Sequence, residues 1–213
     1  MPLQTFFNLP EPKRQAIIDL AIDEFAEHDF PSASISRIVS RAGIAKGSFY
    51  QYFADKKDLF LYLLDLAGHE KMRFVQGLQP PDPRMGLFPY LRWMMEVGST
   101  FRLSNPKLEQ VVYRALYSDS GTWLEAISRL REQTDAYYRH LVQLGMQQGD
   151  VDPAYDPELV AFVLSTLTTE LGKHVMTRLQ VEPAQSVTRE YVAKAAPLLS
   201  EVVHMLEHGL HRK

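Results

Sequence analysis

The sequence contains no cysteine in its 213 residues. This absence excludes disulfide bonds, a thiol nucleophile and thiolate metal sites. Long apolar runs are also missing, because the most apolar stretch, residues 160–171, is interrupted by serine, threonine and glutamate. The first residues lack the charged start and continuous apolar stretch of a signal peptide. We therefore expect a cytoplasmic protein with no membrane partner.

The motifs of common enzyme classes are missing as well. There is no glycine-rich phosphate-binding loop, no serine in a nucleophile elbow and no His-Glu-x-x-His pair. Serine, histidine and aspartate occur, but no spacing links them into a catalytic set. We therefore expect neither an enzyme nor a bound cofactor.

Charge is distributed unevenly along the chain. The whole sequence carries a formal charge of -3 and is 46% hydrophobic, which is typical of a globular protein. Residues 33–57 nevertheless contain five basic residues and one acid, so this segment carries +4 and the remainder -7. A basic segment on an acidic body indicates a local surface for nucleic acid. The six charged residues are Arg37, Arg41, Lys46, Asp55, Lys56 and Lys57.

Apolar residues recur at helical spacing through most of the chain, and no alternating strand pattern stands out. Prolines and glycines separate the helical patterns, most clearly at residues 79–83 and 149–153. We therefore predict an all-α protein of about nine helices. They are expected over residues 13–28, 35–42, 45–53, from 55 onward, 84–103, 106–117, 120–148, 157–180 and 188–210.

Two short helices joined through residues 42–44 form a predicted helix-turn-helix. The small Ala42 and the conformationally free Gly43 suit the tight turn. Apolar residues of both helices face the first helix, which leaves a polar outer face of Lys46, Gly47, Ser48, Tyr50 and Gln51. This face matches the needs of a helix in the DNA major groove.

The chemistry of this face suits DNA recognition. Lys46 can contact a phosphate or a guanine edge, Gln51 can pair with an adenine edge, and Gly47 allows close approach of the backbone. Hydroxyl groups and helix-terminal amides can donate to phosphate oxygens. Tyr52 is left open between core packing and phosphate contact. The predicted DNA contacts are Ser34, Ser36, Arg37, Lys46, Gly47, Ser48, Tyr50, Gln51, Tyr52 and Lys56.

The stretch from Ser34 to Phe53, followed by residues 55–59, resembles the TetR family of transcriptional regulators. The match includes the Ala-Gly turn and the Lys-Gly-Ser-Phe-Tyr segment. Val39 stands where that family usually has alanine. Ala45 replaces the usual serine or threonine, so the recognition helix loses a hydroxyl cap that is worth about 1 kcal/mol.

The resemblance implies an Ω-shaped homodimer with its recognition helices in successive major grooves of a near-palindromic operator. It further implies an N-terminal helix-turn-helix domain of three helices over residues 1–55. Residues 56–213 would form a helical effector-binding and dimerisation domain. Members of the family usually repress transcription until an effector binds. Two alternatives remain open: a helical small-molecule-binding module without DNA binding, and a structural helix pair with a basic face.

The C-terminal body is rich in aromatic residues and methionine. Packing in the core explains such residues individually, whereas together they could line a cavity for a small apolar or aromatic effector. The predicted effector site comprises Trp93, Met94, Phe101, Tyr113, Tyr117, Trp123, Tyr137, Phe162, Glu170 and His174.

The last two predicted helices carry apolar faces for the expected dimer. These faces comprise Leu159, Phe162, Val163, Leu167 and Leu171, then Val192, Leu198, Leu199, Val202, Val203 and Leu206.

Three histidines, His204, His208 and His211, follow one another at helical spacing near the C-terminus. A metal site needs a further ligand. We therefore predict no metal and interpret the histidines as a polar stripe at the dimer edge or in a frayed tail, while metal binding stays open.

Overall fold

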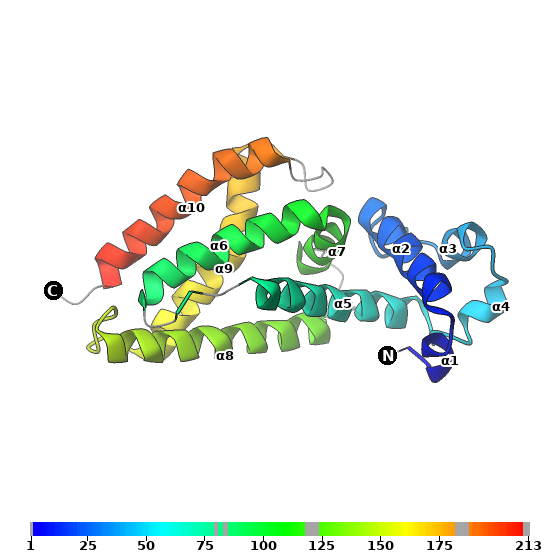
Figure 1. Ribbon diagram of the computed structural model, residues 1–213, viewed down its shortest axis with the longest axis horizontal. Helices are drawn as coiled ribbons and strands as arrows, with labels where there is room; N and C mark the ends of the chain where they lie inside the picture. Colours follow the sequence, from blue (N-terminus) through cyan, green and yellow to red (C-terminus); the bar gives the residue numbers. More distant parts are fainter. Residues whose placement is uncertain (1, 79–80, 83–84, 118–123, 182–187, 211–213) are drawn as a thin grey trace. The chain divides into compact units, whose positions relative to one another are not determined.

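The computed structural model describes residues 2–78, 81–82, 85–117, 124–181 and 188–210, except for the side chains of 117, 124–131, 133 and 169. Every regular element among these residues is a helix, which confirms the predicted all-α class (Figure 1). The helices are α1 (Gln4–Phe7), α2 (Glu11–Glu27), α3 (Ile35–Arg41), α4 (Lys46–Phe49), α5 (Lys56–Gly77), α6 (Leu87–Ser104), α7 (Pro106–Tyr117), α8 (Leu124–Gln148), α9 (Pro157–Arg178) and α10 (Arg189–Leu210).

Side-chain caps explain where several helices begin. The Ser34 hydroxyl oxygen accepts a hydrogen bond from the Arg37 N–H at 3.4 Å and starts α3. Before α5, the Asp55 carboxylate accepts from the Asp58 N–H at 2.7 Å, and the Asp58 carboxylate accepts from the Ala54 N–H at 3.1 Å. This reciprocal arrangement satisfies two backbone donors, as in a capping box with the second bond shifted by one residue.

The helices form two compact units. The first comprises residues 1–74 and 105–124, and the second comprises residues 75–104 and 125–213. Helix α7 thus belongs with α1 to α4 and most of α5, and α5 begins directly after the predicted boundary at residue 55. The division into a DNA-binding segment, 1–55, and an effector segment, 56–213, stays a prediction about function. No described helix combines the length and apolarity needed to span a membrane.

Helix α1 is an element that the sequence pattern did not predict. Its Phe6 side chain is fully buried, with its ring centroid 4.7 Å from that of Phe53. The Leu3 N–H also donates to the Tyr52 carbonyl at 2.8 Å. A four-residue helix is too short to be stable alone or to show periodicity, so these tertiary contacts hold it in place.

Helix α7 packs on α2 within the first unit. The Arg114 guanidinium donates to the carbonyls of Ala26 at 3.1 Å and Glu27 at 3.3 Å, at the C-terminal end of α2. A cation there satisfies orphan carbonyls and favours the helix dipole.

The second unit has its own core, formed by α6, α8, α9 and α10. Figure 1 shows α6 lying between α8 and α10, with α9 crossing them. Close packing explains Gly145 in α8, because a Cβ there would lie 3.2 Å from Leu87. Val203 is fully buried in this core and Leu206 packs against it. Val203 therefore belongs to the interior of the protomer, which corrects its assignment to a dimer face, whereas Leu206 is only partly buried there.

Candidate nucleic-acid interface

The turn between α3 and α4 has the geometry that the sequence predicted. Gly43 has a φ of +63°, a conformation that glycine adopts without a steric penalty. The Gly43 N–H donates to Ser40 at 3.2 Å and the Ile44 N–H donates to Val39 at 3.1 Å. Phe49, at the end of α4, is 1% exposed. The turn and this anchor hold α4 firmly against the rest of the unit.

One face of α4 and the residues after it point to solvent. Lys46, Gly47 and Gln51 are exposed, Tyr50 is 48% exposed and Ser48 is half-buried. The structure thus brings the predicted reading residues together on one short surface. Ala45 caps α4 without a side-chain hydrogen bond, as its lack of a hydroxyl predicted.

Gly47 has no packing role in the described chain. A Cβ built on it would meet no heavy atom within 4 Å. The missing side chain therefore leaves open space in front of the α4 backbone. Such a position allows a ligand backbone to approach closely.

The start of α3 presents fewer free groups than predicted. The Ser34 hydroxyl caps the helix, and the Ser34 N–H donates to Glu24 at 2.7 Å. Ser36 is exposed to solvent. Arg37 is 48% exposed at its side chain, but its guanidinium binds Glu24.

Glu24 is a buried carboxylate that joins α2 to α3. Its side chain is 3% exposed and accepts hydrogen bonds from Arg37 and Ser34. Burial acts to raise the pKa of Glu24, but the hydrogen bonds from Arg37 and Ser34 outweigh it and the pKa lies below its usual value. Glu24 is therefore ionised at neutral pH and fixes the angle between the two helices.

The basic segment is partly neutralised by acids that lie outside it in sequence. Arg37 pairs with Glu24, and Arg41 pairs with Asp23 at 2.8 Å. Asp23 also binds Lys107 of α7 at 2.5 Å. The local excess of +4 thus overstates the charge available to a ligand. Within the described part of the chain, Lys46 has no ion-pair partner and remains exposed.

Lys56 is hydrogen-bonded within the protein, and Tyr52 is buried. The Lys56 ammonium donates to the carbonyls of Phe30 at 2.7 Å, Pro31 at 3.1 Å and Ala33 at 2.9 Å. An ammonium has three N–H groups, so these carbonyls can occupy all of them and anchor the loop before α3, while the phosphate contact of Lys56 stays a prediction. The Tyr52 side chain is 8% exposed, which favours the core alternative for this residue.

Part of the predicted effector set forms a cluster between α6 and α8. The hydroxyls of Tyr90 and Tyr137 share a hydrogen bond of 2.8 Å, and the Tyr137 hydroxyl lies 3.6 Å from the Met94 sulfur. The ring centroids of Trp93 and Tyr90 are 5.5 Å apart. Burial, followed by the hydrogen bond with Tyr90, raises the pKa of Tyr137, so its hydroxyl stays neutral.

The remaining predicted effector residues do not join this cluster. Phe101 is 1% exposed in the interior, while Phe162 is 61% exposed on α9. Glu170 and His174 are exposed on the same helix. Tyr113 belongs to α7 in the other unit, and the Tyr117 side chain and Trp123 lie outside the described residues.

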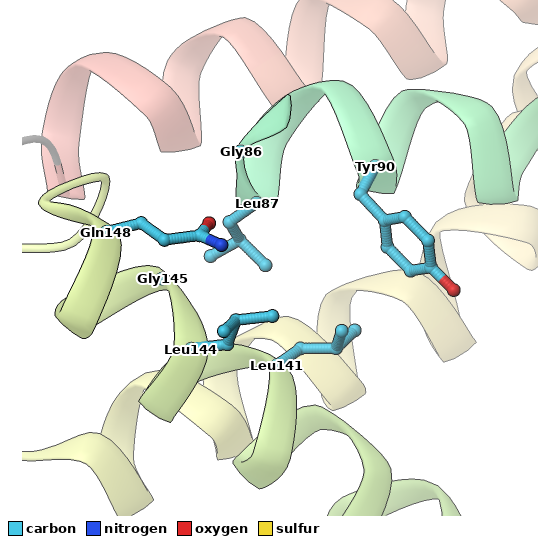
Figure 2. Close-up of a pocket in the computed structure, with 7 residues that line it drawn as sticks. All are labelled: Gly86, Leu87, Tyr90, Leu141, Leu144, Gly145 and Gln148. Carbon is cyan, nitrogen blue, oxygen red and sulfur yellow. The ribbon is translucent and has the colours of Figure 1, made fainter. Parts of the chain in front are cut away.

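Among its described residues, the second unit has a small crevice and a groove. Figure 2 shows a crevice beside Tyr90, between the start of α6 and the end of α8. It holds about 10 Å³, enough for one water molecule. A shallow groove of about 180 Å³ lies between α9 and α10, and His174 lines it. The groove is also lined by Leu171, Val175, Arg178, Leu198, Glu201, Val202 and Met205.

Glu24 was not predicted from the sequence, although the sequence contains a signal for it. Glu24 lies seven residues after Ile17 and three after Ala21, on the apolar stripe of α2. An acid in such a stripe needs a buried partner. Arg37 is the partner, and only the packing of α3 on α2 identifies it.

Models of two protein families match the chain. Residues 17–63 match bacterial regulatory proteins of the tetR family, and residues 85–211 match the tetracyclin repressor-like C-terminal domain. The first match covers α3 and α4, and the second covers the helices of the second unit.

Individual proteins are similar too. The HTH-type transcriptional regulator AcrR of Shigella flexneri is 37% identical over 151 residues, which cover 65% of this chain and 68% of AcrR. The fatty acid metabolism regulator protein of Bacillus subtilis is 35% identical over 32% of this chain, which spans about a third (34%) of that protein. A solved TetR-family regulator from Chloroflexus aurantiacus is 43% identical, with a TM-score of 0.79 and 100% of both chains covered.

Proposed function

Since the chain belongs to the TetR family of transcriptional regulators, we propose that it is a repressor of its own operator. In this proposal a homodimer binds double-stranded DNA in the cytoplasm and a small apolar or aromatic effector releases it. Both relatives are named as regulators, AcrR as a transcriptional one, and we propose no enzymatic activity for this chain.

The exposed face around α4 is the observation that carries the proposal. It combines a cation, Lys46, with an amide, Gln51, and an open backbone at Gly47. Lys46 neutralises phosphate or contacts guanine, and Gln51 pairs with an adenine edge. The hydroxyls of Ser36, Ser48 and Tyr50 donate to phosphate oxygens, which fixes the register of the helix on the duplex.

The second unit supports the dimer and the effector. Large apolar side chains are exposed on its last two helices, with Phe162 at 61% and Met205 at 67%. A second copy would cover them. The cluster of Tyr90, Trp93 and Met94 with Tyr137 offers apolar surface with a few hydroxyl groups, which suits an aromatic effector.

The decisive experiment measures binding to the DNA that flanks the gene of this protein, as a function of salt. Affinity should fall steeply with salt because phosphate contacts release counterions. Lys46→Ala should weaken binding and reduce the salt slope by about one per protomer. Lys13→Ala is the matched control, because Lys13 is an exposed lysine on α2, and it should bind like wild type.

A footprint on the same DNA distinguishes the proposal from a small-molecule-binding module. A protected near-palindrome, with half-sites about 34 Å apart, is expected for two recognition helices. Effector and operator should then weaken each other's binding by the same factor. Absence of both salt-sensitive DNA binding and a footprint would instead assign the chain to the module without DNA binding.

A further inference from the structure

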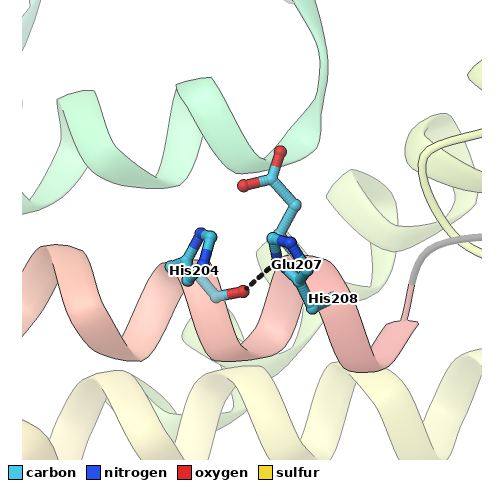
Figure 3. A group of neighbouring side chains, drawn as sticks. All are labelled: His204, Glu207 and His208. Atoms are coloured by element: carbon cyan, nitrogen blue, oxygen red, sulfur yellow. Dashed lines mark hydrogen bonds between the residues drawn. The ribbon is translucent and has the colours of Figure 1, made fainter.

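Three potential metal ligands lie together on one turn near the end of α10. They are His204, Glu207 and His208, and their ligand atoms lie within 4.8 Å of one another. Both histidines are exposed, and Figure 3 shows their rings side by side on the helix. Their ring centroids are 4.0 Å apart. The spacing i, i+4 places two imidazoles on the same helix face.

The hydrogen bond of His208 prepares one imidazole for a metal. Its Nδ1 lies 2.9 Å from the His204 carbonyl oxygen, so the proton is on Nδ1 when the ring is neutral. The lone pair is then on Nε2. Histidines that bind metals typically donate their other N–H to a carbonyl in this way, which fixes the tautomer and the ring orientation.

Glu207 is the third group, and it already has a partner. Its carboxylate forms an ion pair with Arg92 of α6, and both side chains are about a third exposed, at 34% and 32%. In Figure 3 this carboxylate is directed toward α6. A metal ion and Arg92 would therefore compete for the same carboxylate.

We propose that His204, His208 and Glu207 form a site for a late first-row divalent cation such as Zn²⁺. Two imidazoles and a carboxylate are a ligand set that zinc accepts, with a water as fourth ligand. Metal–ligand bonds of about 2.0–2.2 Å require these ligand atoms, which lie within 4.8 Å of one another, to move closer together around the ion. Coordination withdraws Glu207 from Arg92 and so loosens the contact between α6 and α10. This site does not depend on the proposed DNA binding.

The test is a titration of the full-length protein with Zn²⁺ in competition with a chromophoric chelator. One ion per chain is expected. His204→Ala and His208→Ala should each weaken binding by at least about tenfold, as for loss of a group that supports a metal site. His140→Ala is the matched control, because His140 is exposed on α8 with no histidine or acid four residues away, and it should bind zinc like wild type.

Variants of the ion pair test the competition. Glu207→Gln should weaken zinc binding, whereas Arg92→Gln should tighten it because the carboxylate is released. Circular dichroism should show that all variants retain wild-type helix content. Zinc binding that is unchanged in the double variant His204→Ala, His208→Ala would overturn the site. Equal zinc affinity in wild type, Glu207→Gln and Arg92→Gln would remove Glu207 from it and overturn the competition.

Discussion

Arg37 of α3 binds both carboxylate oxygens of Glu24 of α2, with its Nε 2.9 Å from Oε1 and 3.1 Å from Oε2. The two residues differ in exposure, at 48% for the Arg37 side chain and 3% for Glu24. Loss of the partner is therefore more costly for the buried acid than for the half-exposed base. A polar contact of this kind sets the position of α3, and through the turn it sets that of α4.

The first prediction follows from this asymmetry. At pH 7, Arg37→Met should lower the free energy of unfolding by about 2 kcal/mol, because it leaves a buried carboxylate without its cation. Glu24→Gln retains an acceptor for the Ser34 N–H and should cost less, about 1 kcal/mol. Urea denaturation of both variants measures the difference.

The pH dependence of the same variant has a defined sign. The pKa of Glu24 in the folded protein lies below the ordinary value of 4.5, so the folded chain binds this proton more weakly than the unfolded chain. The stabilisation is complete above the ordinary value and is lost as pH falls through the lower folded-state pKa. The difference in free energy of unfolding between wild type and Arg37→Met should therefore become smaller in acid. A deficit that is constant from pH 7 to pH 3 would contradict the role of this ion pair.

Lys56 and Lys57 provide a second, paired prediction. Lys56→Met removes three hydrogen bonds from an ammonium to the carbonyls of residues 30, 31 and 33, and should lower the free energy of unfolding by about 2 kcal/mol. Lys57→Met changes an exposed neighbour and should leave stability within about 0.5 kcal/mol of wild type. Thermal denaturation of the two variants compares them directly. Equal stability of the two would contradict the anchoring role of Lys56.

Gly47 separates folding from DNA binding. Gly47→Ala adds a methyl group that meets nothing within the chain, so stability should be unchanged or higher by up to about 1 kcal/mol. Operator affinity should fall by at least about tenfold if the α4 backbone lies against DNA. Gly68→Ala is the control, because this exposed glycine of α5 also has open space around it. Fluorescence anisotropy with operator DNA would refute the close approach if both variants bound like wild type.

The sequence predicted the elements that depend on local patterns. The turn at Gly43 and the long helices follow from residue type and periodicity. The sequence pattern could not predict which basic residues are neutralised by ion pairs. Asp23 pairs with Arg41, and Glu24 with Arg37, only because α3 packs on α2. The hydrogen bonds of Lys56 could not be predicted for the same reason, since its three carbonyl partners lie more than twenty residues earlier in the chain.

The effector site shows a second limit of the sequence pattern. Aromatic residues at helical spacing indicate that a face is apolar, but the same spacing serves an interior and an exposed face. Phe101 is buried and Phe162 is exposed, although both were assigned to one cavity. Only the packing of α6, α8, α9 and α10 distinguishes them.

The exposed face of α9 provides the last prediction. Phe162 is 61% exposed and Leu159 is 60% exposed, and we expect a second copy to bury both. Phe162→Glu would bury a carboxylate at that interface twice, once per protomer, at a cost of at least about 2 kcal/mol each. Dimerisation should therefore weaken on the order of 10³-fold, which sedimentation velocity at micromolar concentration would detect as a monomer.

Met72→Glu is the control for this variant, because it alters a residue of α5 that is 58% exposed, and it should remain dimeric. The monomeric Phe162→Glu variant should also lose operator affinity, because the two half-sites of the operator are no longer bound by one linked dimer. A Phe162→Glu protein that stays dimeric would show that this face of α9 lies outside the interface.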